Sequence, residues 1–165
     1  MNRQGQQETE REFVDLVKRY ERVIYKVCSF YATEVSPMED LYQEAVLNLW
    51  KAFPKFRGES QISTWIYRVT LNSCISDLRR NGKHVVRAPL EFAENIVFQP
   101  DTMETELREL YRLIRQLGKL ERAIILLWLE DRPYQEIADI TGLTVSNVGT
   151  RLKRTKEKLK SMSNQ

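Results

Sequence analysis

Apolar residues recur every three or four positions through most of the chain, the spacing that places them on one face of an α-helix. No segment alternates apolar and polar residues for long, as a half-buried β-strand would. The pattern predicts a first helix that opens with a capping box of Thr9 and Glu12, a second over residues 36–53 with a capping box of its own, and a third over residues 60–81. The first half of the chain is therefore expected to be a small helical domain.

A segment without sustained periodicity follows at residues 83–103, which contain two prolines and are predicted to form a flexible linker. Beyond it, a helix is expected to begin at about Asp101, and the very apolar residues 120–129 are expected to form a central helix. The fold class that follows is all-α, with two small helical domains at residues 1–82 and 104–165. The apolar positions expected inside the helix that begins at Asp101 are Leu107, Leu110, Ile114 and Leu117.

The sequence at residues 134–154, YQEIADITGLTVSNVGTRLKR, predicts a helix-turn-helix. Gly142 stands where the first helix must end with a positive φ, which glycine adopts at no steric cost, and Thr144 can cap the second helix. Val148 and Leu152, four residues apart, form the stripe that the second helix would bury. An ordinary helical hairpin shares this pattern, so the distribution of charge has to distinguish the two.

Charge is distributed in blocks along the 165 residues, although the net charge is only +3. Residues 27–50 carry four carboxylates and no lysine or arginine, whereas residues 51–87 carry eight cations against two carboxylates. Residues 88–111 are acidic again, and residues 144–160 carry six cations against one carboxylate. Two basic blocks separated by acidic ones favour two separate contacts with a polyanion, and the second block supports a helix-turn-helix that binds DNA.

Composition and motifs exclude several classes of protein. Hydrophobic residues make up 42% and charged residues 30% of the chain, as in a soluble globular protein. No apolar run approaches the roughly 18 residues of a membrane span, and the N-terminus lacks a signal peptide's apolar core, so we expect a cytoplasmic protein without membrane insertion. Cys28 and Cys74 are far apart in the sequence and His84 is the only histidine, which argues against a zinc site and a disulfide framework and favours buried thiols. We expect no metal, no cofactor and no catalytic residue.

The helix predicted at residues 36–53 carries a second face, opposite its apolar stripe, that is acidic with one leucine in its middle. A solvated helix face would look the same, because single exposed leucines are common. An acidic face on a protein with basic blocks elsewhere nevertheless suits a protein partner rather than DNA. The residues of this second face are Asp40, Gln43, Glu44, Leu47, Asn48 and Lys51.

The stretch FRGESQISTWIYRVTLN, at residues 56–72, interleaves aromatic residues with arginines. This mixture suits single-stranded nucleic acid, whose bases stack on rings while cations follow the phosphates. The alternative is that Trp65 and Tyr67 simply belong to the hydrophobic core. In the same way, Gly58 and Ser60 could form no more than a turn and a helix cap.

The chain resembles bacterial RNA polymerase sigma factors of the sigma-70 family in two runs, DLYQEAVLNLWKAFPKFRGESQISTWIYRVTLNSCISDLRR and YQEIADITGLTVSNVGTRLKRTKEKL. The type is the small extracytoplasmic-function (ECF) class, which keeps only the second and fourth conserved regions. The resemblance covers roughly residues 10–82 and 104–160 and is specific, because two independent motifs occur in the family's order and spacing. It implies that the first domain binds core RNA polymerase and opens the minus-ten element as single strands. The second domain is expected to read the minus-thirty-five element as duplex. An anti-sigma factor is the expected regulator.

The resemblance also assigns roles to residues by position. Polymerase binding is assigned to Asp40, Gln43, Glu44, Leu47 and Asn48. Recognition and melting of the minus-ten element are assigned to Phe56, Arg57, Gly58, Ser60, Trp65, Asn72, Arg79 and Arg80. Contacts with the minus-thirty-five element are assigned to Ser146, Asn147, Thr150, Arg151, Lys153 and Arg154. The chain departs from the family at Gly149, where members commonly have a lysine, and at Pro133, where a serine cap is usual.

The alternative is a one-component transcriptional regulator, with the first domain as a ligand-binding or dimerisation module and the helix-turn-helix on an operator. Such a first domain needs an apolar pocket or a dimer face. This hypothesis does not explain why the stretch FRGESQISTW follows an acidic helix. The basic recognition helix disfavours an all-α scaffold or an anti-sigma factor, and the lack of a clustered nucleophile and base disfavours an enzyme. The sequence therefore predicts a promoter-specificity subunit without an active site of its own.

Overall fold

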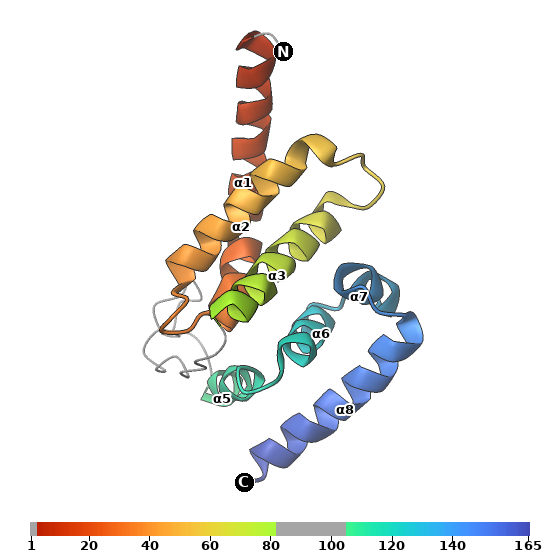
Figure 1. Cartoon of the computed structure of the whole chain (residues 1–165). Helices are drawn as coiled ribbons and strands as arrows, with labels where there is room; N and C mark the ends of the chain where they lie inside the picture. The colour runs from red at the N-terminus through yellow and green to blue at the C-terminus, as the bar shows by residue number, and fades with distance from the viewer. Residues whose placement is uncertain (1–2, 82–104) are drawn as a thin grey trace. The chain divides into compact units, whose positions relative to one another are not determined.

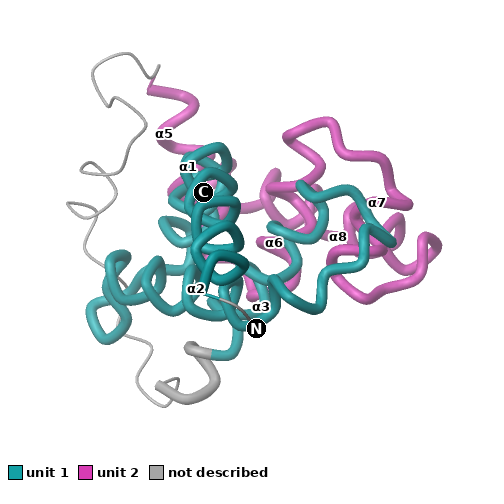
Figure 2. The backbone as a smooth tube through the Cα atoms, turned by 90° about the horizontal axis from the view of Figure 1, so that it is seen from above, with its two compact units in different colours: residues 1–88 teal, residues 89–165 magenta. Residues whose placement is uncertain are grey.

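The computed structural model describes residues 3–81 and 105–165. Every regular element in these two ranges is helical, which confirms the expected all-α class. The chain forms two compact units, residues 1–88 and residues 89–165, which Figure 2 draws in different colours. The linker predicted at residues 83–103 lies outside the described residues.

The first unit is built from helices that pack side by side, as Figure 1 shows. Its elements are α1 (Arg3–Tyr31), α2 (Met38–Ala52), the short 3₁₀ helix η1 (Phe53–Lys55) and α3 (Ile62–Asn81), with the side chains of α3 described as far as Ser76. Each pair among α1, α2 and α3 is in contact, so one core forms between them. Ile24, Leu41 and Ile66, one from each helix, are fully buried in that core.

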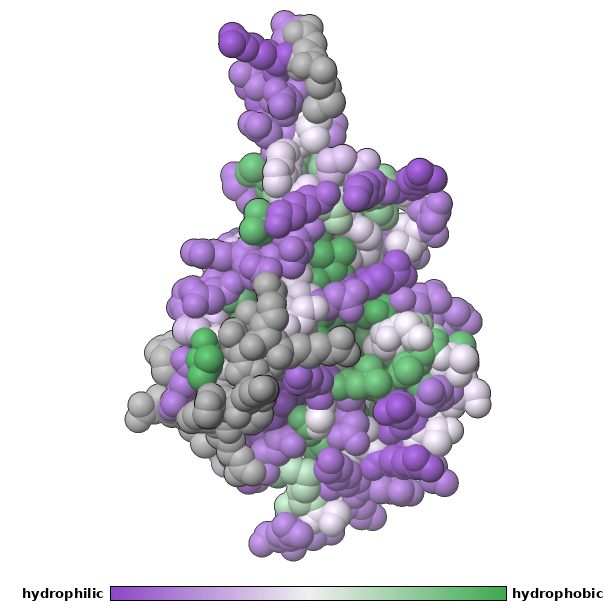
Figure 3. All heavy atoms as spheres, viewed as in Figure 1, coloured by the Kyte–Doolittle hydropathy of each residue, from purple (hydrophilic) through white to green (hydrophobic). Residues whose placement is uncertain are grey.

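The N-terminal part of α1 extends beyond α2 and α3 in Figure 1, and its side chains on the face seen in Figure 3 are hydrophilic. Because α1 already begins at Arg3, the helix start predicted from Thr9 and Glu12 is wrong. Thr9 lies inside the helix, where its Oγ1 donates a hydrogen bond to the carbonyl of Gly5 at 2.9 Å instead of capping. The first buried residue of α1 is Phe13, so the apolar pattern located the packed part of the helix but not its beginning.

Helix α2 begins at Met38, two residues after the predicted start, and its cap position is occupied by Pro37 rather than by Ser36 of the predicted capping box. Two carboxylates in the first turn stabilise this end of the helix through the macrodipole. The ring of Tyr42 stacks on that of Tyr25 in α1, with centroids 4.2 Å apart, and this contact fixes α2 against α1. The pKa of Tyr42 is raised to about 12, mainly because burial disfavours the charged form and secondly because of the electrostatic interaction with Tyr25. Its hydroxyl is protonated at neutral pH.

The described part of the second unit consists of α5 (Thr105–Ile114), α6 (Lys119–Leu129), α7 (Tyr134–Thr141) and α8 (Val145–Ser163). Helix α6 contacts both α7 and α8, and residues 123–127 are all buried, which confirms the predicted central helix. Ile114 and Leu117 are buried as expected, but Leu107 is 39% exposed, so the prediction that it lies inside is wrong. The start predicted for this helix at residues 101–104 lies outside the described residues.

Helices α7 and α8 and the turn between them form the predicted helix-turn-helix. Gly142 ends α7 in the left-handed conformation, with φ of +75°. Thr144 caps α8, because its Oγ1 accepts a hydrogen bond from the backbone N–H of Asn147 at 3.1 Å. Val148 and Leu152 are buried on the inner side of α8, so the opposite side of this helix is left for solvent or a partner.

Candidate functional site

The acidic face, which comprises Asp40, Gln43, Glu44, Leu47 and Asn48, lies mainly on the outer side of α2. Asp40 and Gln43 are exposed, and Glu44 is half-buried. Leu47 is 45% exposed in the middle of the face, while the opposite stripe of α2 is buried in the core. The face therefore combines negative charge with an accessible leucine side chain.

Asn48 differs from the other residues of the acidic face because it bonds to α3. Its Nδ2 donates a hydrogen bond to Oγ of Ser73 at 2.9 Å, and that hydroxyl in turn donates to the carbonyl of Val69 at 2.7 Å. Asn48 is half-buried as a result. Its amide ties α2 to α3 at the edge of the acidic face.

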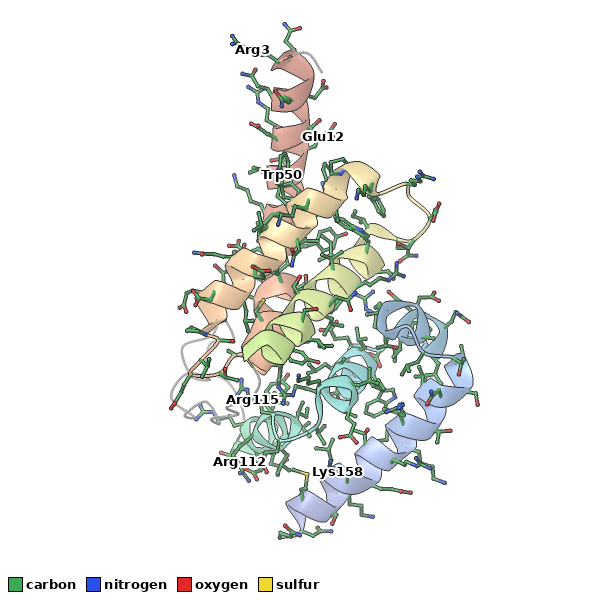
Figure 4. The ribbon with its side chains drawn as sticks, viewed as in Figure 1. Arg3, Glu12, Trp50, Arg112, Arg115 and Lys158 are labelled. Atoms are coloured by element: carbon green, nitrogen blue, oxygen red, sulfur yellow. The ribbon has the colours of Figure 1, made fainter. Side chains whose placement is uncertain are left out.

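An apolar extension of the acidic face at Trp50 was not predicted from the sequence. This residue lies one turn beyond Leu47, is 36% exposed, and is labelled on α2 in Figure 4. Its ring meets Phe13 of α1 edge-on, with centroids 5.0 Å apart, and Val14 beside Phe13 is also exposed. The signal that the sequence offered was a tryptophan at helical spacing from an outward-facing leucine.

The assignment of Trp65 as a surface on which bases stack needs correction. Trp65 is only 8% exposed, and its ring contacts those of Phe56 and Phe53, with centroids 5.1 and 6.4 Å away. A ring buried to this extent has no face to offer to a base. Tyr67 is buried as well, so the alternative that both are core residues is right. Trp65 instead supports Phe56, which is half-buried at the start of the loop before α3.

The loop between η1 and α3 bends at Gly58, whose φ is +73°. A Cβ added at Gly58 would meet nothing within 4 Å, so the backbone conformation, rather than close packing, favours glycine. Arg57 is exposed in this loop, Ser60 is half-buried, and Asn72 is exposed on α3. The side chains of two further assigned residues, Arg79 and Arg80, lie outside the described part of the chain.

The residues that the resemblance assigns to the minus-thirty-five element lie on the outer side of α8, which we call the recognition surface. Its exposed members are Ser146, Asn147, Thr150, Lys153 and Arg154, and its half-buried member is Arg151. Nε of Arg151 donates a hydrogen bond to Oδ1 of Asn147 at 3.1 Å, which orients the guanidinium along the helix. This bond uses one of the five N–H donors of the arginine and does not involve its two terminal nitrogens.

Further cations of α8 are engaged within the second unit. Nζ of Lys156 lies 3.7 Å from the centre of the Trp128 ring, a cation–π contact. Nζ of Lys158, which Figure 4 labels, lies 3.2 Å from Oε2 of Glu121. The same carboxylate oxygen accepts a hydrogen bond from the backbone N–H of Gly118 at 3.2 Å. These lysines therefore stabilise α8 against α6 and its start.

Two positions depart from the family pattern. A Cβ added at Gly149 would lie 3.6 Å from Cε2 of Tyr134, an ordinary van der Waals distance, so a larger residue fits there. Pro133 occupies the cap position of α7 and supplies no capping hydrogen bond. An ion pair between Nη1 of Arg132 and Oε1 of Glu136, at 2.6 Å, spans this helix start instead.

Comparison with known proteins identifies the family of the chain. The sigma-70 region 2 family matches residues 16–84, and the sigma-70 region 4 family matches residues 107–159. The ECF RNA polymerase sigma-E factor of Escherichia coli K12 is 30% identical over 86% of this chain and 81% of that protein. The chain belongs to the ECF sigma factors. The sigma-E factor of Haemophilus influenzae is 29% identical to this sigma factor, over 94% of this chain and 89% of the relative.

Two solved structures share the fold of this sigma factor. CnrH, in complex with the cytosolic domain of CnrY, superposes with a TM-score of 0.67 at 21% identity, over 94% of this chain and 89% of that one. The sigma factor RpoE, in complex with the anti-sigma factor NepR from Bartonella quintana, superposes with a TM-score of 0.69 at 17% identity. That superposition covers 94% of this chain and 96% of RpoE.

As an ECF sigma factor, the protein binds core RNA polymerase and directs transcription from specific promoters. An operator-binding one-component regulator is not favoured. Sigma factors are transcription initiation factors. Within residues 3–81 and 105–165, no helix combines the length and apolar character needed to cross a membrane.

Proposed function

We propose that this sigma factor uses separate surfaces for polymerase binding, strand opening and duplex reading. The acidic face of α2 binds core polymerase, and the recognition surface of α8 reads the minus-thirty-five element. The distribution of exposed groups carries the proposal, because carboxylates and leucine line α2 whereas hydroxyl, amide and cationic groups line α8. Residues 1–82 and 104–165 are the two functional domains, and residues 83–103 connect them. The minus-ten element is opened by Phe56, Arg57, Gly58, Ser60, Asn72, Arg79 and Arg80.

Such a subunit needs no active site, metal or cofactor of its own, because nucleotidyl transfer belongs to the polymerase. Among the described residues, no group of three or more His, Cys, Asp or Glu side chains is placed to hold a metal ion. We place the protein in the cytoplasm, where it has access to polymerase and promoter DNA.

We further propose that an anti-sigma factor regulates this protein by covering its binding surfaces. One structural neighbour is bound to the anti-sigma factor NepR. The exposed Leu47 and Trp50 on α2 give this chain accessible apolar area beside its carboxylates. A protein that covers this area competes with core polymerase for the acidic face.

The whole proposal is tested by adding the purified chain to core polymerase and sequencing the 5′ ends of the transcripts. We expect starts at a defined set of promoters that share minus-ten and minus-thirty-five elements. Binding of duplex DNA without core polymerase, combined with no promoter-specific starts in its presence, would instead support an operator-binding protein.

Replacing Asn72 by alanine is expected to slow opening of the minus-ten element while duplex binding by the second unit stays unchanged. Asn72 is exposed on α3, and a hydrogen bond from its side chain to an unstacked base contributes about 0.5–1.5 kcal/mol. The measurement compares transcription from duplex and pre-melted promoters. Ser76→Ala, one turn further along the exposed side of α3, is the matched control. An equal proportional loss on both templates would show that Asn72 does not act in opening.

Gly149→Lys is expected to tighten binding to all minus-thirty-five sequences alike by supplying an additional cation. A phosphate contact of this kind steepens the salt dependence of binding by about one unit of slope. Gly149→Ala is the control, because it restores helix propensity of about 1 kcal/mol without adding charge. Titration of duplex DNA at several salt concentrations measures both effects, and identical slopes for the two variants would contradict a phosphate near residue 149.

A further inference from the structure

Two cysteines meet in the core of the first unit, although they are 46 residues apart in the sequence. Sγ of Cys74 on α3 lies 3.9 Å from Sγ of Cys28 on α1, and neither residue exposes any surface. Both side chains are thiols and no disulfide joins them. Their burial agrees with the sequence analysis, but nothing in their spacing indicated that they touch.

We propose that Cys28 and Cys74 form a redox-sensitive pair, which a peroxide converts into an intramolecular disulfide linking α1 to α3. A disulfide bond is about 2.0 Å long, so the two sulfur atoms have to approach each other by about 1.9 Å. Side-chain rotation and a small shift between the helices cover such a distance. Paired thiols can also bind a metal ion, which needs further ligands. Among the described residues, no third His, Cys, Asp or Glu side chain joins these two thiols.

The proposed oxidation consumes one molecule of hydrogen peroxide. The sulfur of one cysteine attacks a peroxide oxygen, the O–O bond breaks, and the products are a sulfenic acid and water. The second thiol then attacks the sulfenic sulfur, the S–O bond breaks, and a second water leaves as the S–S bond forms. The two sulfurs together lose two electrons and two protons, and a small thiol reverses the link by exchange.

Burial makes the first of these steps slow. Buried thiols are inert until local opening exposes them, so peroxide reaches this pair only when α1 separates transiently from α3. The second step follows once α1 packs against α3 again, because the packed helices bring the partner sulfur to the oxidised one. The pair therefore responds to peroxide most readily under conditions that also loosen the first unit, such as elevated temperature.

The position of the pair connects it to two of the proposed binding surfaces. Ser73, next to Cys74, accepts the hydrogen bond from Asn48 of the acidic face at 2.9 Å, and Asn72 is exposed on the same turn of α3. A shift of α3 at Cys74 moves both neighbours, so we expect the disulfide to lower promoter-directed transcription. This consequence rests on the proposed function of both surfaces, whereas formation of the disulfide does not.

The link is tested on the full chain, reduced and then exposed to hydrogen peroxide at increasing temperature. Denaturation, alkylation and peptide mass spectrometry are expected to find the peptides of Cys28 and Cys74 joined, with two hydrogen atoms lost. Cys28→Ala and Cys74→Ala are the controls, because each keeps one thiol and alanine adds no buried polar atom. Thiols that stay reduced up to the unfolding transition, or that oxidise without joining to each other, would overturn the proposal.

Portions of the oxidised protein taken before denaturation, mixed with core polymerase and a promoter template, test the consequence of the link. The linked protein is expected to give about tenfold fewer transcripts than the reduced protein, as when a contact weakens by about 1.4 kcal/mol. Dithiothreitol should restore activity, and the alanine variants should not respond to peroxide. Full activity of the linked protein would overturn the switch. A wrong assignment of the binding surfaces is distinguishable from a wrong switch, because the reduced Asn72→Ala protein would then open promoters normally.

Discussion

Reversing two carboxylates of the acidic face, as Asp40→Lys with Glu44→Lys, is expected to lower the affinity for core RNA polymerase at least about a hundredfold. Asp40 is exposed, and residues 27–50 contain no lysine or arginine, so a partner surface that fits this face carries positive charge. Two lysines there place like charges against each other across the interface, at a cost of several kcal/mol. A binding titration with labelled core enzyme at two salt concentrations measures the loss, which should be larger at low salt.

The matched control is Glu34→Lys with Glu39→Lys. Both residues are exposed, the double variant changes the net charge by the same amount, and Glu39 shares the first turn of α2 with Asp40. The two variants thus lose the same favourable charge at one helix terminus. Thermal unfolding of each should show that the first unit remains folded. If both double variants bind core polymerase alike, the acidic face is not the binding surface.

The helix-turn-helix could be predicted from the sequence because its signals are local. Gly142 takes a positive φ that disfavours other residues, and the hydroxyl of Thr144 reaches a backbone N–H three residues away. Neither the φ angle of Gly142 nor the hydrogen bond of Thr144 depends on the rest of the chain. Val148 and Leu152 follow from helical periodicity alone, so the outer side of α8 could be deduced as well.

Errors arose where tertiary packing or a competing local bond decides the outcome. The Thr9 hydroxyl bonds a carbonyl in the preceding turn of α1, which the capping pattern does not distinguish from a true cap. Trp65 fits a base-stacking pattern by composition, but Phe53 and Phe56 surround it with apolar contacts. Leu107 keeps helical spacing, yet it is exposed on a short helix. Periodicity predicts which face of a helix is apolar, not whether a neighbour covers it.

Contacts between segments that are far apart in the chain could not be predicted from the sequence. The approach of Cys28 to Cys74 requires the crossing of α1 and α3, and the hydrogen bond from Asn48 to Ser73 requires that of α2 and α3. No local propensity encodes either distance. These contacts nevertheless link the core of the first unit to its proposed binding surfaces.

Arg151→Ala is expected to change which minus-thirty-five sequences are preferred rather than to weaken all of them equally. The bond from Nε of Arg151 to Oδ1 of Asn147 orients the guanidinium, and its terminal nitrogens can pair with N7 and O6 of a guanine. Such a pairing contributes about 1–3 kcal/mol of discrimination against other bases. Asn147→Ala should give a smaller loss at the same base pair, and the double variant little more than Arg151→Ala alone. A panel of single base-pair changes, titrated at two salt concentrations, measures these preferences.

Lys156→Ala is the matched control for the loss of a cation from α8. Because the ammonium of Lys156 lies over the Trp128 ring at an exposed site, its removal should lower the stability of the second unit by only about 0.5–1 kcal/mol. Affinity should then fall evenly across the panel or not at all. If Arg151→Ala also gives an even loss with a shallower salt slope, Arg151 holds a phosphate instead of a base. Base reading would in that case depend on the polar residues at the N-terminal end of α8, which are Ser146, Asn147 and Thr150.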